Sequence, residues 1–248
     1  VMALRDYYHT VLDLFYPRSC LHCKRNLNDS HELYICEDCN RQIPYVNELH
    51  CIRCGSAIGQ YSTSTTKEGC TVCKGKHLHF DALTAIAHYE GVMKTLIHKF
   101  KYARQKFLFC ILNDFVITHK KLKEIAPDID VVVPVPLHWL KKMHRGFNQS
   151  ELLSLGIQRY FSKPMSSGNL CRIKNTESQT HLSKSQRQVN IHNAFFVKCP
   201  RSFQGKKILL VDDVFTTGVT ASECSKKLKE SGARSVHLLV LANAEYNS

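Results

Sequence analysis

Two neighbouring carboxylates, Asp212 and Asp213, are the residues whose possible chemistry is clearest in this sequence. They follow the apolar run 208–211, which is too short for a helix and predicts a strand buried on both faces of a parallel sheet. Ligands of open α/β sheets bind at the carboxyl ends of the strands. The sequence therefore predicts a ligand site at this acid pair, where carboxylates can hold hydroxyl groups or a divalent cation.

A short loop rich in threonine follows the acid pair. Residues 216–220 (Thr-Thr-Gly-Val-Thr) lead into apolar positions with helical spacing that stop at Gly232. The free N–H groups and the dipole at a helix N-terminus attract anions. Two carboxylates beside such an anion cradle repel its ligand unless they bind hydroxyls or a cation. A sugar phosphate carried with Mg²⁺ satisfies both halves of the pattern.

This order of strand, two acids and phosphate loop resembles the phosphoribosyl pyrophosphate (PRPP) loop of type I phosphoribosyltransferases. The resemblance implies that Asp212 and Asp213 hold the ribose 2′- and 3′-hydroxyls. It also implies that the 5′-phosphate is bound by the loop, whose residues are Val214, Phe215, Thr216, Thr217, Gly218, Val219 and Thr220. The alternative is an ordinary strand-to-helix turn with a solvated acidic pair.

Another strand and helix predict a second anion site. Residues 130–136 predict a buried strand, which Pro134 should end or place at the edge of the sheet. The stretch 137–149 reads as a basic loop, and Asn148 with Glu151 three residues later is typical of a capping box that opens a helix. The start of that helix offers a second set of N–H groups to an anion.

In phosphoribosyltransferases the corresponding loop holds the pyrophosphate. The resemblance implies substrate contacts from Leu137, Arg145 and Gly146, with Arg145 making bidentate phosphate contacts and Gly146 allowing close approach of the backbone. Lys141 and Lys142 are either neighbours of the leaving group or merely exposed.

Two further stretches could reach the substrate. Residues 82–89 predict a strand, and the helix expected over 93–100 has a basic face that continues to Lys101. That face is either solvated or turned toward a phosphate. The polar segment 175–193, which contains Arg187, is the expected flexible lid over the substrate. Short strands are expected at 195–197 and 235–241.

Eight of the twelve cysteines form four Cys-x-x-Cys pairs, and each pair can present two thiolates to one metal ion. Sequential pairing makes a double zinc ribbon with two structural Zn²⁺ sites. Cross-braced pairing and an iron–sulfur cluster stay open as alternatives. The eight residues are Cys20, Cys23, Cys36, Cys39, Cys51, Cys54, Cys70 and Cys73.

Composition predicts a cytoplasmic protein with no membrane span. No apolar run approaches ~18 residues, and charge interrupts the first turns, so a signal peptide is not expected. Disulfides are rare in such a reducing compartment. The four other cysteines, Cys110, Cys171, Cys199 and Cys224, are therefore predicted to be buried thiols. The net charge of +13 suits a phosphate-bearing substrate or nucleic acid.

Several segments together resemble the ComF family, among them Arg145-Gly-Phe-Asn-Gln149, Val133-Pro-Val-Pro-Leu137 and the PRPP loop. Its members join a zinc-ribbon N-terminus to a phosphoribosyltransferase-like domain. The resemblance implies an α/β type I phosphoribosyltransferase fold, with a mostly parallel sheet flanked by helices. Residues 1–79 would form an N-terminal helix and the double zinc ribbon, and residues 80–248 the phosphoribosyltransferase-like domain.

Two functional hypotheses follow. The first is a pentosyltransferase that binds PRPP with Mg²⁺ and transfers phosphoribose to an unidentified nitrogen acceptor. The second is a non-catalytic component of the competence machinery that senses PRPP or a nucleotide and handles single-stranded DNA with a helicase or translocase partner. Members of the ComF family are implicated in DNA uptake during natural transformation. Neither G-x-x-x-x-G-K-[ST] nor G-x-G-x-x-G occurs, so the chain is not itself an ATP-driven motor.

Overall fold

The computed structural model describes residues 19–27, 34–46, 50–56, 58, 69–102, 106–174, 191 and 193–244. The expected N-terminal helix and nearly all of the expected lid lie outside these residues. Within them, every helix is too short or too polar to cross a membrane.

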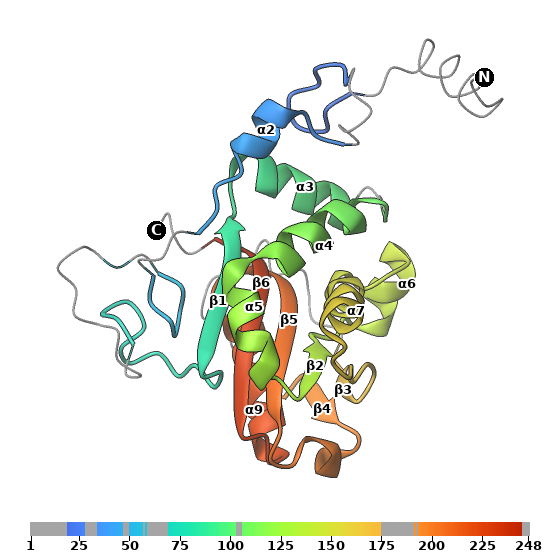
Figure 1. Ribbon diagram of the computed structural model, residues 1–248. Coiled ribbons are helices and arrows are strands. Elements are labelled where there is room, and N and C mark those ends of the chain that lie inside the picture. The colour runs from blue at the N-terminus through green and yellow to red at the C-terminus, as the bar shows by residue number, and fades with distance from the viewer. Residues whose placement is uncertain are drawn as a thin grey trace.

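Four parallel strands form the central sheet, in the order β1-β6-β5-β2 (Figure 1). Apolar runs predict all four, because a parallel strand is covered on both faces. Pro134 is the last residue of an edge strand of this sheet, as predicted. The strands are β1 (Ala82–His88), β2 (Val131–Pro134), β5 (Lys207–Phe215) and β6 (Ser235–Asn243).

The strand that carries the acid pair is longer than the sequence predicts. β5 continues past Val211, because Asp212 still pairs with Val240 of β6 and Phe215 pairs with Asn243. The two acids therefore belong to the strand itself, near its carboxyl end, rather than to the loop after it. Their backbone is held in place by ladder hydrogen bonds on the β6 side.

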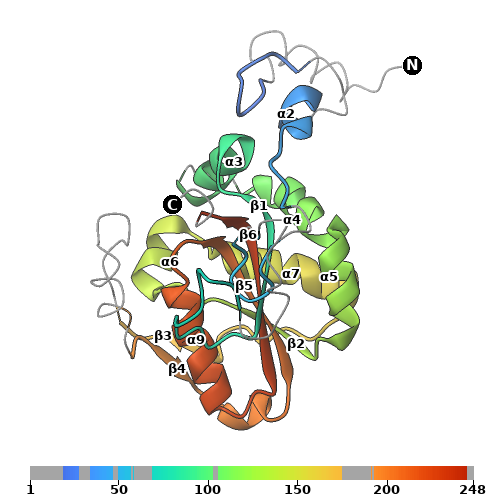
Figure 2. The same cartoon turned by 90° about the vertical axis from the view of Figure 1, so that its left-hand side faces the viewer.

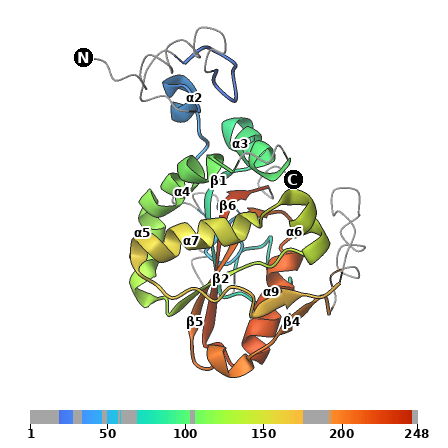
Figure 3. The same ribbon diagram turned by 90° about the vertical axis from the view of Figure 1, so that its right-hand side faces the viewer.

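Helices cover both faces of the sheet (Figures 2 and 3). Leu209 and Val211 of β5 pack in the core beneath α3, α4, α5 and α7, whereas Ile208 and Leu210 pack beneath α9. This alternation is the two-residue period of a strand. The helices are α3 (Gly91–Tyr102), α4 (Leu108–Thr118), α5 (Lys120–Ile125), α7 (Gln149–Phe161) and α9 (Val219–Glu230), with short turns at α2 (Glu37–Arg41), Ala126–Asp128 and Pro200–Phe203.

Part of the stretch 137–149, predicted to be a loop, is helical. α6 (Trp139–Arg145) has no buried residue, so it lacks the periodic apolar face by which a helix is recognised. Gly146 ends α6 with a φ of 80°, a left-handed conformation that glycine adopts without strain. The prediction of an irregular loop here is wrong.

A small second sheet lies beside α9. β3 (Leu170–Arg172) pairs antiparallel with β4 (Phe195–Val197), and only β4 was expected from the sequence. The predicted N-cap of α7 is confirmed, since the Asn148 side chain accepts a hydrogen bond from Ser150 N. The capping box is not formed, because the Glu151 carboxylate binds Lys142 and Ser167 instead.

Candidate functional site

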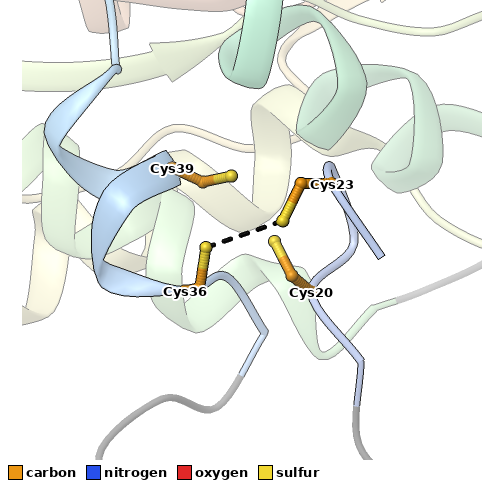
Figure 4. Close-up of side chains that lie close together, drawn as sticks. All are labelled: Cys20, Cys23, Cys36 and Cys39. Atoms are coloured by element: carbon orange, nitrogen blue, oxygen red, sulfur yellow. Dashed lines mark hydrogen bonds between the residues drawn. The ribbon is translucent and has the colours of Figure 1, made fainter. Parts of the chain in front are cut away.

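The cysteines of the four pairs gather in two groups of four, the first of which is shown in Figure 4. Within each group all Sγ atoms lie within 4.8 Å of one another. The pairing is sequential, as predicted, and the cross-braced alternative is wrong. The first group is Cys20, Cys23, Cys36 and Cys39, and the second is Cys51, Cys54, Cys70 and Cys73.

The Sγ separations fit a tetrahedral Zn²⁺ ion. They are 3.7 Å between Cys23 and Cys36 in the first group and 3.6 Å between Cys54 and Cys70 in the second. A tetrahedron with Zn–S bonds of ~2.3 Å has edges of ~3.8 Å. Burial disfavours the thiolate of Cys20, but backbone hydrogen bonds within its group outweigh burial and lower its pKa to about 6. Burial and the neighbouring thiols instead raise the pKa of Cys39 in the same group. A bound cation would stabilise the thiolate form of all four cysteines.

The other four cysteines are mostly not buried, contrary to the sequence-based prediction. Cys224 lies on the buried face of α9, but Cys110 and Cys199 are exposed and Cys171 is partly exposed. Cys110 lies on α4, whose buried face is formed by other positions, and Cys199 precedes a surface turn. The prediction failed because the exposure of a cysteine side chain depends on which face of its helix or turn it occupies.

A cavity of about 300 Å³ opens beside the carboxyl ends of β2 and β5. It brings together residues that were predicted from separate stretches of the sequence. Gly146 does not line it, and Arg187 lies outside the described residues. The predicted residues in its wall are Lys101, Leu137, Arg145, Asp212, Asp213, Val214, Phe215, Thr216, Thr217, Gly218, Val219 and Thr220.

An ion pair crosses the floor of the cavity. Lys101 Nζ, at the end of α3, lies 2.8 Å from Asp213 Oδ1, and the two side chains are only 17% and 11% exposed. Burial disfavours the Lys101 ammonium, but the carboxylates of Asp213 and Asp212 outweigh burial and raise the pKa of Lys101. The lysine therefore stays protonated beside the acid pair.

Asp212 is held differently from its neighbour. Its Oδ1 accepts hydrogen bonds from Ser150 Oγ at 3.0 Å and from Asp213 N at 2.9 Å. Burial and the charge of Asp213 raise the pKa of Asp212 to about 7, although Lys101 works in the opposite direction. Asp212 is therefore partly protonated near neutral pH.

The phosphate loop ends at the first turn of α9. Gly218 is the N-cap of that helix with a φ of 72°, and a Cβ atom there would lie 2.7 Å from the Phe215 ring. A residue with a side chain would therefore be both strained and crowded at this position. The glycine allows the first turn of α9, from Val219 to Ala221, to face the cavity. N–H groups of a first turn favour an anion.

Three cations also line the cavity. Lys141 and Arg145 come from α6, and Arg172 comes from β3. Burial lowers the pKa of Lys141, and the positive charges of Arg172 and Arg145 lower it further. Positive groups held this close together favour an anionic ligand. Lys142 is instead paired with Glu151 on the surface.

Gln149 adds a donor to this part of the cavity. It is buried, its Oε1 accepts a hydrogen bond from Arg145 Nη1 at 3.3 Å, and its Nε2 lacks a hydrogen-bond partner among the described residues. A buried amide donor beside the three cations suits a ligand oxygen.

Sequence reasoning missed several residues of the cavity. Gln149 and Ser150 follow the predicted N-cap Asn148, so the helix start could have indicated them. Arg172 and Tyr102 had no signal, because Arg172 lies on a three-residue strand and Tyr102 at the end of a helix. Tyr89 belongs to a segment, Tyr89-Glu-Gly, that resembles the ComF family, but it was given no role in the site. The missed residues are Tyr89, Tyr102, Gln149, Ser150 and Arg172.

The two cysteine groups are hydrogen-bonded, directly or through the segment that follows, to two different helices that contribute residues to the cavity. In the first, His22 Nδ1 lies 2.9 Å from Thr95 Oγ1 of α3, the helix that carries Lys101 in its last turn. After the second, His79 Nδ1 lies 2.9 Å from Ser222 Oγ of α9, and Ser222 Oγ donates to His77 O at 3.0 Å. A Cβ atom on Gly218 would be 3.6 Å from Leu78, so this segment reaches the phosphate loop itself.

Comparison with known domain families agrees with these features. Residues 11–74 match the double zinc ribbon domain, and residues 128–246 match the phosphoribosyl transferase domain. Together with the parallel sheet, its helices and the two four-cysteine groups, these matches define a type I phosphoribosyltransferase fold with an N-terminal double zinc ribbon. The predicted fold class is confirmed.

The chain belongs to the ComF family. It is 32% identical over 243 residues to Competence protein F of Haemophilus influenzae, covering 93% of this chain and 99% of that protein. It is 30% identical to the DNA utilization protein YhgH of Salmonella typhi, over 91% of this chain and 96% of that one. Competence protein ComFC of Bacillus subtilis is 27% identical over 80% of this chain and 79% of its own length.

Proposed function

We propose that this chain binds PRPP or a related ribose phosphate in the cavity and serves DNA uptake. One observation supports this most strongly. A single cavity is lined by the acid pair, the phosphate loop and the three cations. These are the three kinds of group that a ribose with phosphates at both ends requires.

Each end of the ligand has its own partners in this proposal. Asp212 and Asp213 accept hydrogen bonds from the ribose 2′- and 3′-hydroxyls, and the first turn of α9 binds the 5′-phosphate. Lys141, Arg145 and Arg172 bind the pyrophosphate. Magnesium, when it arrives with the diphosphate of PRPP, would neutralise further charge there. The acid pair alone does not fit that ion in the free protein, because Lys101 already holds Asp213.

As a transferase, the site would promote displacement at C1′ of PRPP. The C1′–O bond breaks, pyrophosphate takes the electron pair, and a nitrogen acceptor bonds to C1′ and releases a proton. The three cations stabilise the charge that develops on pyrophosphate. Gln149 and the surrounding buried side chains position that end of the ligand.

The role in DNA uptake rests on the relatives named for competence and DNA utilization. A second function, handling of single-stranded DNA with a helicase or translocase, is favoured by the basic charge of +13 and by α6. On that basic helix Trp139 is 60% exposed and available for base stacking.

The double variant Asp212→Asn, Asp213→Asn separates the two functions. It removes two acceptors for ribose hydroxyls and should weaken PRPP binding about 100-fold, measured by calorimetry, because each charged hydrogen bond contributes ~1.5–3 kcal/mol. DNA affinity should hold or rise slightly, since it depends on the basic residues. Asp114→Asn, an exposed acid on α4, is the control. If the double variant binds PRPP as tightly as the parent, the proposed site is wrong.

A further inference from the structure

The acid pair already has a cation. Lys101 Nζ and Asp213 Oδ1 are 2.8 Å apart, and little of either side chain reaches solvent. Solvent and salt screen such a pair far less than an exposed one. Lys101 is fixed by its helix, because Leu96, Ile97 and Phe100 of α3 are fully buried.

The pair is also poorly suited to a metal ion of its own. Asp212 Oδ1 already accepts two hydrogen bonds. In the described part of the chain, three or more potential metal ligands meet only in the two cysteine groups. Magnesium requires about six oxygen ligands in a near-octahedral arrangement. Two carboxylates, one of them paired with an ammonium, leave most of that shell to the ligand and to water.

We propose that Lys101 is the resident counter-ion of the acid pair and that it competes with divalent cations for Asp213. The cavity therefore binds the ribose 5-phosphate part of its ligand without a metal ion held by the protein. The ligand part of this proposal rests on the proposed function, whereas the competition with metal does not. A divalent ion that enters the cavity comes with a diphosphate. Lys101 is thus a positioning residue, which sets the charge and the orientation of Asp213.

Manganese binding tests the competition directly. Lys101→Met keeps the length of the side chain and removes its charge, and free Mn²⁺ is followed by electron paramagnetic resonance during titration. We expect this variant to bind one Mn²⁺ ion at the acid pair with an affinity at least about ten-fold higher than that of the parent for the same site. The further change Asp213→Asn should abolish this gain in affinity. Lys94→Met removes the same charge from an exposed position of α3 and should behave like the parent. Lys101→Arg keeps the charge and should also show no gain in affinity.

Equal Mn²⁺ affinity of the folded Lys101→Met variant and the parent would overturn the proposal. Zinc content and circular dichroism establish that the variant is folded. A second measurement needs only the parent protein, titrated with ribose 5-phosphate in Mg²⁺-free buffer and again with Mg²⁺. We expect the two affinities to agree within about two-fold, and a ten-fold gain with Mg²⁺ would also overturn the proposal.

The two arms distinguish the possible failures. If the parent binds ribose 5-phosphate in neither buffer, the proposed function is wrong, and the Mn²⁺ titration alone decides the role of Lys101. If the sugar phosphate binds without metal but the Lys101→Met variant gains no Mn²⁺ site, the proposed function stands and the counter-ion proposal falls.

Discussion

The two zinc ribbons use the same ligands but are joined to different helices, the first to α3 and the second, through the segment that follows it, to α9. The first ribbon packs on α3, where Ile35 and Ile43 join the core beneath that helix. The same helix carries Lys101, the cation that is paired with Asp213. The second ribbon leads directly into the segment that contacts Ser222 and the phosphate loop. We therefore expect the first ribbon to affect the charge of the site through Lys101. We expect the second to affect the backbone conformation of the phosphate loop.

From this difference we expect the metal ions to have a role beyond the folding of the ribbons. A structural zinc site supplies on the order of 10–16 kcal/mol to a small segment with few apolar residues. We expect the ribbons also to order the cavity, because each is joined by a hydrogen bond to a helix that contributes residues to it. The division into residues 1–79 and 80–248 stays a prediction, and these contacts cross it.

The largest effect is expected from breaking the second ribbon. Cys70→Ser with Cys73→Ser should lower the zinc content from about two ions to one and weaken ribose 5-phosphate binding by about 30-fold, or ~2 kcal/mol. The physical reason is that the phosphate loop loses the segment that packs against Gly218. Metal analysis and calorimetry measure both quantities. Unchanged affinity with one zinc lost would show that the loop needs no such support.

Breaking the first ribbon should have a smaller effect of another kind. Cys20→Ser with Cys23→Ser also removes one zinc, but ribose 5-phosphate affinity should fall only about five-fold, or ~1 kcal/mol. Displacement of Lys101 takes away the charge that lowers the pKa of Asp212, so this pKa should rise from about 7. Carboxyl chemical shifts followed against pH report it. Equal losses of affinity in the two ribbon variants would remove the distinction between the two ribbons.

The smallest effects come from single hydrogen bonds of each ribbon. Ser222→Ala and Thr95→Val should each reduce the free energy of unfolding by ~1 kcal/mol, measured in urea. Ser222→Ala should also weaken ribose 5-phosphate binding about two- to three-fold, because Ser222 lies one turn after the start of α9, the end that is proposed to bind the phosphate. Thr95→Val should leave that affinity unchanged. A larger loss of ribose 5-phosphate affinity in Thr95→Val than in Ser222→Ala would show that the contact on α3 matters more for the site.

Short-range patterns in the sequence predicted much of this fold and site. The buried strands, the cysteine pairs and the acid pair with its phosphate loop depend on neighbouring residues or on a fixed spacing, so a local pattern is enough to show them. The prediction failed where that signal is missing. α6 buries no face, and β3 has only three residues. Two of the four cysteines outside the pairs are exposed, and a third is partly exposed.

By itself, the sequence determined which residues could do chemistry: the carboxylates, the threonine loop, the basic residues and the eight metal ligands. Only the tertiary structure decided how they meet. Lys101 reaches Asp213 across more than a hundred residues of chain, and Arg172 joins the α6 cations from a separate small sheet. The reason is physical. Local patterns record burial and backbone preference, whereas an ion pair between distant residues depends on how helices and strands pack, and no local pattern records that packing.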